Sequence, residues 1–214
     1  FSMKLKIAIM SGDDIGIEIV PMAKLVLTET LQSIGYSIEL IELPIGKLAH
    51  TMYGDTFPEY TVSQLNEVHG IICGPIGHNN YPRNDSTWKM PPIRKKFELY
   101  AAVRPAKSYD NSKNIDIIFV RELTEGLQSS DTIVGGYPEF RPNDDITIAS
   151  RVITRKGSNR VAKAAFDLAI SKNRSKVTAA HKEPLFRLSC GMFLEECVKV
   201  SKEYPSISDR KSVV

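Results

Sequence analysis

The first third of the chain alternates between short apolar runs and one long helical repeat. Residues 4–10 form a run with an apolar end, which is typical of a buried strand. Apolar side chains then recur at helical spacing from Ile15 to Ile34, and Gly35 stands where such a helix would end. Residues 37–43 alternate as a second strand. The order strand, turn, helix, strand predicts a layered α/β domain.

The rest of the chain predicts further strands joined by helices. We expect short strands at 69–74, 99–104, 115–120 and 176–180, β structure at 146–154, a short helix at 92–98, a helix capped by Ser158, and a long amphipathic helix at 183–204 that begins at Pro184. The polar tail at 206–214 ends on two apolar residues for which the pattern offers no partner strand. We therefore predict an α/β fold with a first lobe at 3–104 and a second lobe at 105–214.

Bulk composition narrows the class of protein. The 214 residues are 42% hydrophobic and 25% charged, close to a globular average, which argues against long disorder. A net charge of +3 is too small to indicate a nucleic-acid-binding protein. The three cysteines are far apart and form no CxxC pair, so we expect reduced thiols in a cytoplasmic protein. No apolar run reaches membrane-spanning length, no signal peptide opens the chain, and we expect Met3 to be the natural first residue.

Three arginines lie near predicted strands and suggest a ligand with several negative charges. Arg104 and Arg121 stand at the edges of apolar runs, and Arg94 lies in the predicted short helix. The guanidinium group is a planar fork that holds carboxylates in bidentate fashion. A solvated surface arginine is the simpler explanation for any one of them. Their positions at strand edges favour a shared role in binding a small polyanion.

Two further features carry candidate chemistry. Lys182 directly follows the predicted strand at 176–180 and His181, and a lysine at a strand end can be partly desolvated and suited to base work. An ordinary exposed lysine remains the alternative. The glycine turn at 12–16 leads into a helix and could hold an anion, but its spacing is not GxGxxG.

Five ordered sequence blocks together resemble one known family. The blocks are GDDIGIE at 12–18, GPIG at 74–77, LYAAVRP at 99–105, RELTEG at 121–126 and AHK at 180–182, the last followed by Leu188, Gly191, Phe193 and Tyr204-Pro205. Their order and spacing are similar to those of the isocitrate, isopropylmalate, homoisocitrate and tartrate dehydrogenases. The resemblance extends from Met3 to about Pro205.

The resemblance implies a fold and an activity. Family members have the isopropylmalate-dehydrogenase-like two-lobe layered fold, and they oxidise and decarboxylate a 2-hydroxy di- or tricarboxylic acid with NAD or NADP and Mg²⁺ or Mn²⁺. By matched position, Arg94, Arg104 and Arg121 would bind the substrate carboxylates, and Lys182 would assist removal of the hydroxyl proton. The segment at about 127–145 would form an intersubunit β arm of a homodimer. A small carboxylate is the implied partner, and neither a nucleic acid nor a membrane is.

The chain departs from the family pattern at several positions. Gln128 stands where the family has its acid tyrosine, Pro184 where it has an asparagine near the nicotinamide, and Asp14 replaces a glycine. The family's metal-binding aspartates and adenosine-binding loop lie beyond the equivalent of Tyr204-Pro205, and Asp209 does not match the first of these aspartates. We therefore expect a chain truncated at its C-terminal side, with no metal ligand or assignable cofactor residue of its own and little activity alone.

Three hypotheses about function remain open at this point. The chain is a truncated or shortened dehydrogenase, a non-catalytic regulatory or assembly subunit that binds a carboxylate anion, or a plain anion-binding module. The sequence does not choose between NAD and NADP or among the hydroxy acids.

Overall fold

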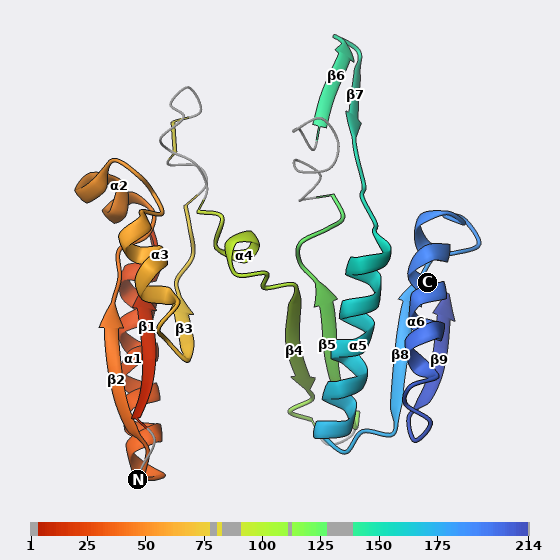
Figure 1. Ribbon diagram of the computed structural model, residues 1–214, viewed down its shortest axis with the longest axis horizontal. Coiled ribbons are helices and arrows are strands. Elements are labelled where there is room, and N and C mark those ends of the chain that lie inside the picture. The colour runs from red at the N-terminus through yellow and green to blue at the C-terminus, as the bar shows by residue number, and fades with distance from the viewer. Residues whose placement is uncertain (1–3, 78–80, 83–90, 111–112, 128–138, 214) are drawn as a thin grey trace. The chain divides into compact units, whose positions relative to one another are not determined.

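The computed structural model of the chain describes residues 4–77, 81–82, 91–110, 113–127 and 139–213 (Figure 1). Its contacts divide it into two compact units, Phe1–Ile93 and Arg94–Val214. In the described part of the chain, β4 (Ala101–Lys107) pairs with β5 (Asp116–Glu122).

The N-terminal unit is built on a parallel three-stranded sheet. Its strands are β1 (Lys4–Met10), β2 (Ser37–Glu42) and β3 (Gly70–Cys73), in the order β2-β1-β3. Helix α1 (Gly16–Ser33) packs against all three strands, and α2 (Lys47–Tyr53) and α3 (Glu59–Leu65) fill the connection from β2 to β3. Because β1 is central, its end at Ala8, Ile9 and Met10 is buried.

Helix α1 ends as the sequence predicts. Gly35 has a φ of 85°, which a residue with a side chain adopts rarely. Its amide donates to the carbonyl of Gln32, and the amide of Tyr36 donates to the carbonyl of Leu31. These two bonds satisfy carbonyls that the helix leaves open at its end, which is the Schellman arrangement.

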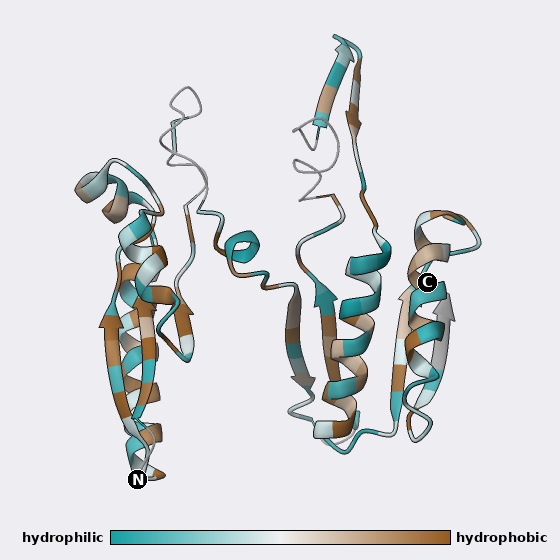
Figure 2. Cartoon of the chain, in the orientation of Figure 1, coloured by the Kyte–Doolittle hydropathy of each residue, from teal (hydrophilic) through white to brown (hydrophobic). Residues whose placement is uncertain are grey.

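The helical repeat of α1 predicted the helix but not which residues are buried. Within α1 only Gly16 and Val20 are buried. Ile19, Met22 and Val26 remain 48–65% exposed along one side of the helix. Figure 2 shows apolar residues along α1 as well as in the strands. The apolar pattern of α1 is therefore wider than the face that packs on the three strands.

The C-terminal unit contains two small sheets, a hairpin and two longer helices. Its elements are α4 (Ile93–Lys96), the antiparallel pair β4 and β5, the hairpin β6 (Glu139–Asn143) and β7 (Ile146–Ala149), α5 (Arg155–Ser171), β8 (Lys176–His181), α6 (Ser189–Ser201) and β9 (Ser208–Val213). Strands β8 and β9 pair in parallel. Their core with α5 and α6 includes Phe166, Ala179, Val200 and Ile207.

Three expectations for this unit are wrong in detail. Thr154, not Ser158, caps α5: its side chain accepts from the amide of Gly157 at 3.0 Å, while Ser158 is buried one turn inside the helix. Helix α6 begins at Ser189 rather than at Pro184, because the preceding residues form turns. The tail is not unpaired either, since β9 hydrogen-bonds to β8, a long-range pairing that periodicity cannot reveal.

A buried carboxylate joins α5 to α6. Glu196 is 6% exposed and accepts hydrogen bonds from the amide of Asn159 at 2.9 Å and the guanidinium of Arg155 at 3.2 Å. Arg155 also binds the exposed Glu195 at 2.9 Å. The Asn159 amide and the Arg155 guanidinium hold the pKa of Glu196 below its usual range, although burial acts in the opposite direction.

Glu196→Gln is expected to destabilise the protein in a pH-dependent way. Because the folded-state pKa is lowered, the stabilising effect of Glu196 is present above the ordinary carboxyl pKa of about 4.3 and is lost as the pH falls through the lower folded-state value. Urea unfolding should show a difference between wild type and variant that is larger at neutral pH and shrinks in acid. Glu195→Gln, at the exposed neighbour, is the control. A Glu196→Gln effect that does not change with pH would contradict this role.

Candidate functional site

Arg104 and Arg121 lie on the same face of the β4–β5 pair. The register places Arg121 opposite Ala102, and Arg104 is two residues further along β4. Residues two apart on a strand share a face, so the two arginines are diagonal neighbours, roughly 7–8 Å apart. The structure thus brings together two side chains that the sequence only suggested as a pair.

None of the described helices of the same unit covers this face of the pair. Helix α5 packs against β5, and its Arg160 reaches Glu122 on the half-buried side of the strand. Arg121 and Phe119 alternate with that side and are exposed, Phe119 by 57%. Within the described part of the chain, no carboxylate pairs with Arg104 or Arg121. Two unpaired guanidinium groups on one face form a surface suited to an anion.

The structure does not place Arg94 and Lys182 in contact with this face. Arg94 lies in α4 and is exposed. Lys182 follows β8, which belongs to a different sheet from β4 and β5. No hydrogen bond or ion pair among the described residues joins either side chain to Arg104 or Arg121. Lys182 is also exposed, which agrees with the alternative of an ordinary exposed lysine, and the buried position at the end of β8 is taken by His181.

A partly buried ion pair anchors the end of β5, and its basic member, Arg160, was not among the predicted site residues. The Arg160 and Glu122 side chains are 20% and 16% exposed, and Nη2 and Oε1 are 2.9 Å apart. The guanidinium of Arg160 also lies over the ring of Tyr100, 4.6 Å from its centroid. Glu122 further accepts from the amides of Thr124 at 2.6 Å and Glu125 at 2.7 Å. No local sequence signal identifies this partnership, because Glu122 and Arg160 are 38 residues apart in the chain.

The second glutamate of the RELTEG block anchors the start of α5. Glu125 accepts from the amide of Thr154 at 2.9 Å and from its hydroxyl group. A Cβ atom on Gly157 would lie 2.4 Å from the Glu125 carboxyl group, so glycine leaves the space that this contact needs. The two glutamates of the block therefore hold structure, and Arg121 is the residue of the block that faces outward.

In the N-terminal unit, the buried Asp13 ties three loops together. Its carboxylate accepts from the amide of Lys47 at 2.9 Å, the amide of Gly77 at 3.0 Å and the hydroxyl group of Tyr81 at 2.8 Å. Asp13 is 2% exposed and Tyr81 is 8% exposed. Burial, followed by the hydrogen bond to Asp13, raises the pKa of Tyr81. Asp13 therefore acts as a structural carboxylate.

These contacts do not support an anion site in the turn before α1. The first amides of the helix, those of Gly16, Ile17 and Glu18, donate to the carbonyl groups of the three residues from 13 to 15. The Asp13 carboxylate accepts from Lys47, Gly77 and Tyr81 instead. Asp14, which stands where the resembled family has glycine, adopts a φ of 50°, a conformation that aspartate tolerates better than most residues.

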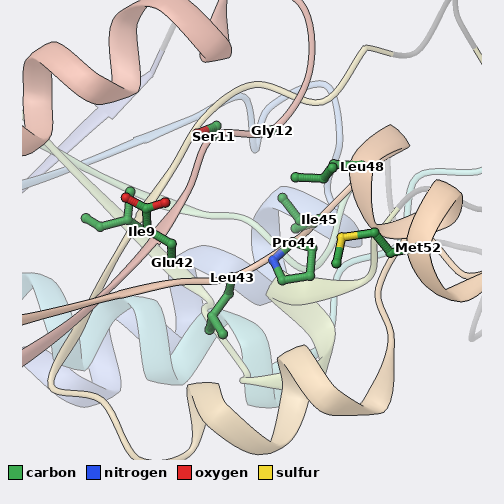
Figure 3. Close-up of a pocket in the computed structure, with 9 residues that line it drawn as sticks. All are labelled: Ile9, Ser11, Gly12, Glu42, Leu43, Pro44, Ile45, Leu48 and Met52. Atoms are coloured by element: carbon green, nitrogen blue, oxygen red, sulfur yellow. The ribbon is translucent and has the colours of Figure 1, made fainter.

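A cavity of about 230 Å³ lies at the ends of β1 and β2 beside α2 (Figure 3). Its walls are mainly apolar and include Ile9, Leu43 and Met52. Glu42 is the carboxylate in its lining, and this side chain pairs with Lys24 at 2.5 Å. The cavity is smaller than the roughly 300–1,000 Å³ typical of small-molecule sites. We assign no cofactor to it.

The sequence of the chain matches a known protein family. The family profile described as isocitrate/isopropylmalate dehydrogenase matches residues 6–214. The chain belongs to this family. The resemblance of the five blocks is thereby confirmed.

Individual family members are similar over nearly the whole chain. Homoisocitrate dehydrogenase of Methanocaldococcus jannaschii is 36% identical over 94% of this chain and 58% of its own length. The 3-isopropylmalate dehydrogenase of Saccharolobus solfataricus is 31% identical over 94% and 56%, respectively. The crystal structure of isocitrate dehydrogenase from Methylococcus capsulatus has a TM-score of 0.77 at 29% identity and covers 98% of this chain and 60% of that one. The α/β fold class is confirmed, and the chain spans somewhat under two thirds of the length of these relatives.

Some expectations for this family member lie outside the described residues or find no support in them. Gln128 and positions 128–138 of the expected arm are not described. Among the residues that are, no three His, Cys, Asp or Glu side chains gather where they could hold a metal ion. A hard cation takes several carboxylate oxygens, so the described residues do not fit Mg²⁺ or Mn²⁺.

Among the helices that the structure describes, none is long and apolar enough to cross a membrane.

Replacing either arginine of the exposed face should weaken anion binding. Charge-assisted hydrogen bonds to arginine contribute about 1.5–3 kcal/mol each, so Arg104→Ala or Arg121→Ala should raise the Kd for citrate by about tenfold or more. The measurement is the citrate-induced rise in Tm across a concentration series. Lys172→Ala, which removes one exposed positive charge after α5, is the matched control. Equal losses in all three variants would show that only net charge matters.

Proposed function

We propose that this chain contributes the carboxylate-binding surface and the base of a dehydrogenase that oxidatively decarboxylates a 2-hydroxy di- or tricarboxylic acid with NAD or NADP. The observation that carries the proposal is the placement of Arg104 and Arg121 on one uncovered face of the β4–β5 pair. Two guanidinium forks suit a ligand with two carboxylates. Family membership supplies the reaction class, and the relatives are named for homoisocitrate and 3-isopropylmalate.

The chain's own side chains would perform the binding and proton-transfer parts of this reaction. Arg104 and Arg121 would hold two carboxylates and orient the substrate. Arg94 would extend this grip, and Lys182 would take the proton of the 2-hydroxyl group. No described residue is assigned to NAD(P) or to a divalent cation, so we derive no step that passes through either group.

A second candidate function is a non-catalytic subunit that binds a carboxylate anion. Two observations on the described residues favour it. Arg104 and Arg121 share a face that suits an anion, whereas no group of carboxylates lies where it could hold a metal ion. Such a subunit would alter the activity of a full-length family member rather than turn over substrate itself.

We further propose a cytoplasmic setting. Cys190 and Cys197 are buried and form no disulfide. Burial is the largest influence on Cys197 and raises its pKa to about 12, which keeps this thiol protonated and unreactive. Unpaired thiols are typical of reducing compartments.

The 214-residue polypeptide alone should show little or no dehydrogenase activity. Polarisation by a metal ion contributes several kcal/mol to such reactions, which corresponds to about a thousandfold or more in rate. The assay follows NADH or NADPH at 340 nm with isocitrate, isopropylmalate, homoisocitrate or tartrate and Mg²⁺ or Mn²⁺. Turnover near about one per second, lost in Lys182→Met, would contradict the prediction. A change in the rate of a full-length relative on mixing would favour the second candidate.

The hairpin β6–β7 supports a homodimer. Phe140 pairs with Ile148, and Ile146 shares the face of Ile148; all three are 41–51% exposed. An isolated two-stranded hairpin is marginally stable in water, and an exposed apolar face on it calls for a partner. The described hairpin belongs to the segment at about 127–145 that the family resemblance assigns to an intersubunit arm. A second copy of the chain is the partner we propose.

Light scattering at micromolar concentration should give the mass of a dimer, and Ile148→Glu should shift it to a monomer. The charge would have to be buried against the partner, which costs several kcal/mol. Thr147→Glu places the same charge on the opposite face of β7 and serves as the control. A monomeric wild type, or a dimer that persists in Ile148→Glu, would reject this interface.

A further inference from the structure

His181 occupies the buried end of β8 and accepts a hydrogen bond from the main chain. The residue is 7% exposed, and its Nδ1 atom accepts from the amide of Glu183 at 3.1 Å. A nitrogen that accepts carries no proton, so the neutral ring has its proton on Nε2. Nε2 is buried and has no hydrogen-bond partner among the residues that the structure describes.

The hydrogen bond closes a turn with Lys182 at its centre. On one side of Lys182, the Glu183 amide is held by the imidazole. On the other side, the carbonyl oxygen of Lys182 accepts from the amides of Leu185 at 3.1 Å and Phe186 at 2.9 Å. The main chain around Lys182 is therefore fixed, while its side chain is exposed.

Because Nε2 has no partner, the hydrogen bond accepted by Nδ1 is the contact that explains a histidine at this buried position. A buried donor without a partner is destabilising, and an apolar side chain at the same position would avoid that cost. An apolar side chain would, however, leave the Glu183 amide without its acceptor. An imidazole fills a core position and presents an acceptor at Nδ1, which a leucine cannot do.

We propose that His181, in its Nε2–H form, is a positioning residue that fixes the location of Lys182 through the Glu183 amide. It acts through the turn and need not touch a substrate. The assignment of Lys182 as the base rests on the proposed function, whereas the positioning itself is a property of the turn and can be tested without turnover.

The turn offers a matched pair of substitutions. His181→Asn retains an acceptor at the position of Nδ1, because an asparagine side chain commonly accepts from the amide two residues later. His181→Leu has similar bulk to the imidazole and no acceptor. His181→Gln places its amide group further out, where Nε2 lies, and is a second variant that should fail to restore the turn.

The experiment measures the turn and the lysine directly. Hydrogen exchange of the Glu183 amide, followed by NMR, should be slow in wild type and His181→Asn and at least about tenfold faster in His181→Leu and His181→Gln. Labelling of Lys182 by pyridoxal 5′-phosphate and borohydride, quantified by peptide mass, should change in the same two variants and be restored in His181→Asn. Labelling of Lys172 should stay constant in all of them.

Nitrogen-15 spectra of the wild-type imidazole provide a test that needs no variant. They should show a protonated Nε2 and an unprotonated Nδ1 at neutral pH. A proton on Nδ1, or unchanged exchange and labelling in both His181→Leu and His181→Gln, would overturn the proposal. Failure of the proposed function would appear separately, as a citrate-induced rise in Tm that Arg104→Ala and Arg121→Ala leave unchanged, while these turn measurements come out as expected.

Discussion

The ion pair between Glu122 and Arg160 is the interaction on which the candidate site depends. It joins the end of β5 to α5, and the Glu122 carboxylate also accepts from the main-chain amides of Thr124 and Glu125. Removing one partner of a fully buried pair costs about 3–5 kcal/mol, and less where solvent reaches the pair as it does here at 16% and 20% exposure. Because successive residues of a strand face opposite sides, anchoring Glu122 against the helix directs Arg121 to the open face.

In the N-terminal unit, too, a buried carboxylate fixes the surrounding main chain by accepting hydrogen bonds. Asp13 accepts three hydrogen bonds, one from the loop after β2 and two from the loop after β3. Glycine leaves space for this approach, since a Cβ on Gly46 would lie 2.6 Å from the Asp13 carboxylate. Asp13, Glu122 and Glu125 of the family blocks are thus acceptors for main-chain amides. The basic residues Arg104, Arg121 and Lys182 remain on the surface. The charged residues of one sequence block therefore have two different roles: some stabilise the fold, and others are exposed and available to a ligand.

Both units leave large apolar side chains exposed to solvent. Ile19, Met22 and Val26 of α1 and the hairpin face around Ile148 are all at least 41% exposed. For the hairpin, the two-stranded geometry and the register supply a physical reason to expect a second copy of the chain. For α1, the structure shows a helix whose apolar surface is wider than its contact with the sheet.

Local patterning determined much of this protein. The sequence predicted the parallel strands and long helix of the first unit, the strands β4, β5 and β8, the glycine that ends α1 and the family itself. These depend on periodicity, turn chemistry and ordered motifs, which act over a few residues. The candidate arginines were also identified from the sequence, because strand edges and residue type are local properties.

Only the tertiary structure decided how these parts meet. The β8–β9 pairing, the burial of His181 in place of Lys182, and the partnership of Glu122 with Arg160 join residues far apart in the chain or depend on which face is covered. The same limit applies to the cap of α5, since both Thr154 and Ser158 have the required hydroxyl group, and Thr154 is the one held by the distant Glu125. Local sequence specifies what an element is, whereas partner choice and burial follow from packing between elements that the sequence separates.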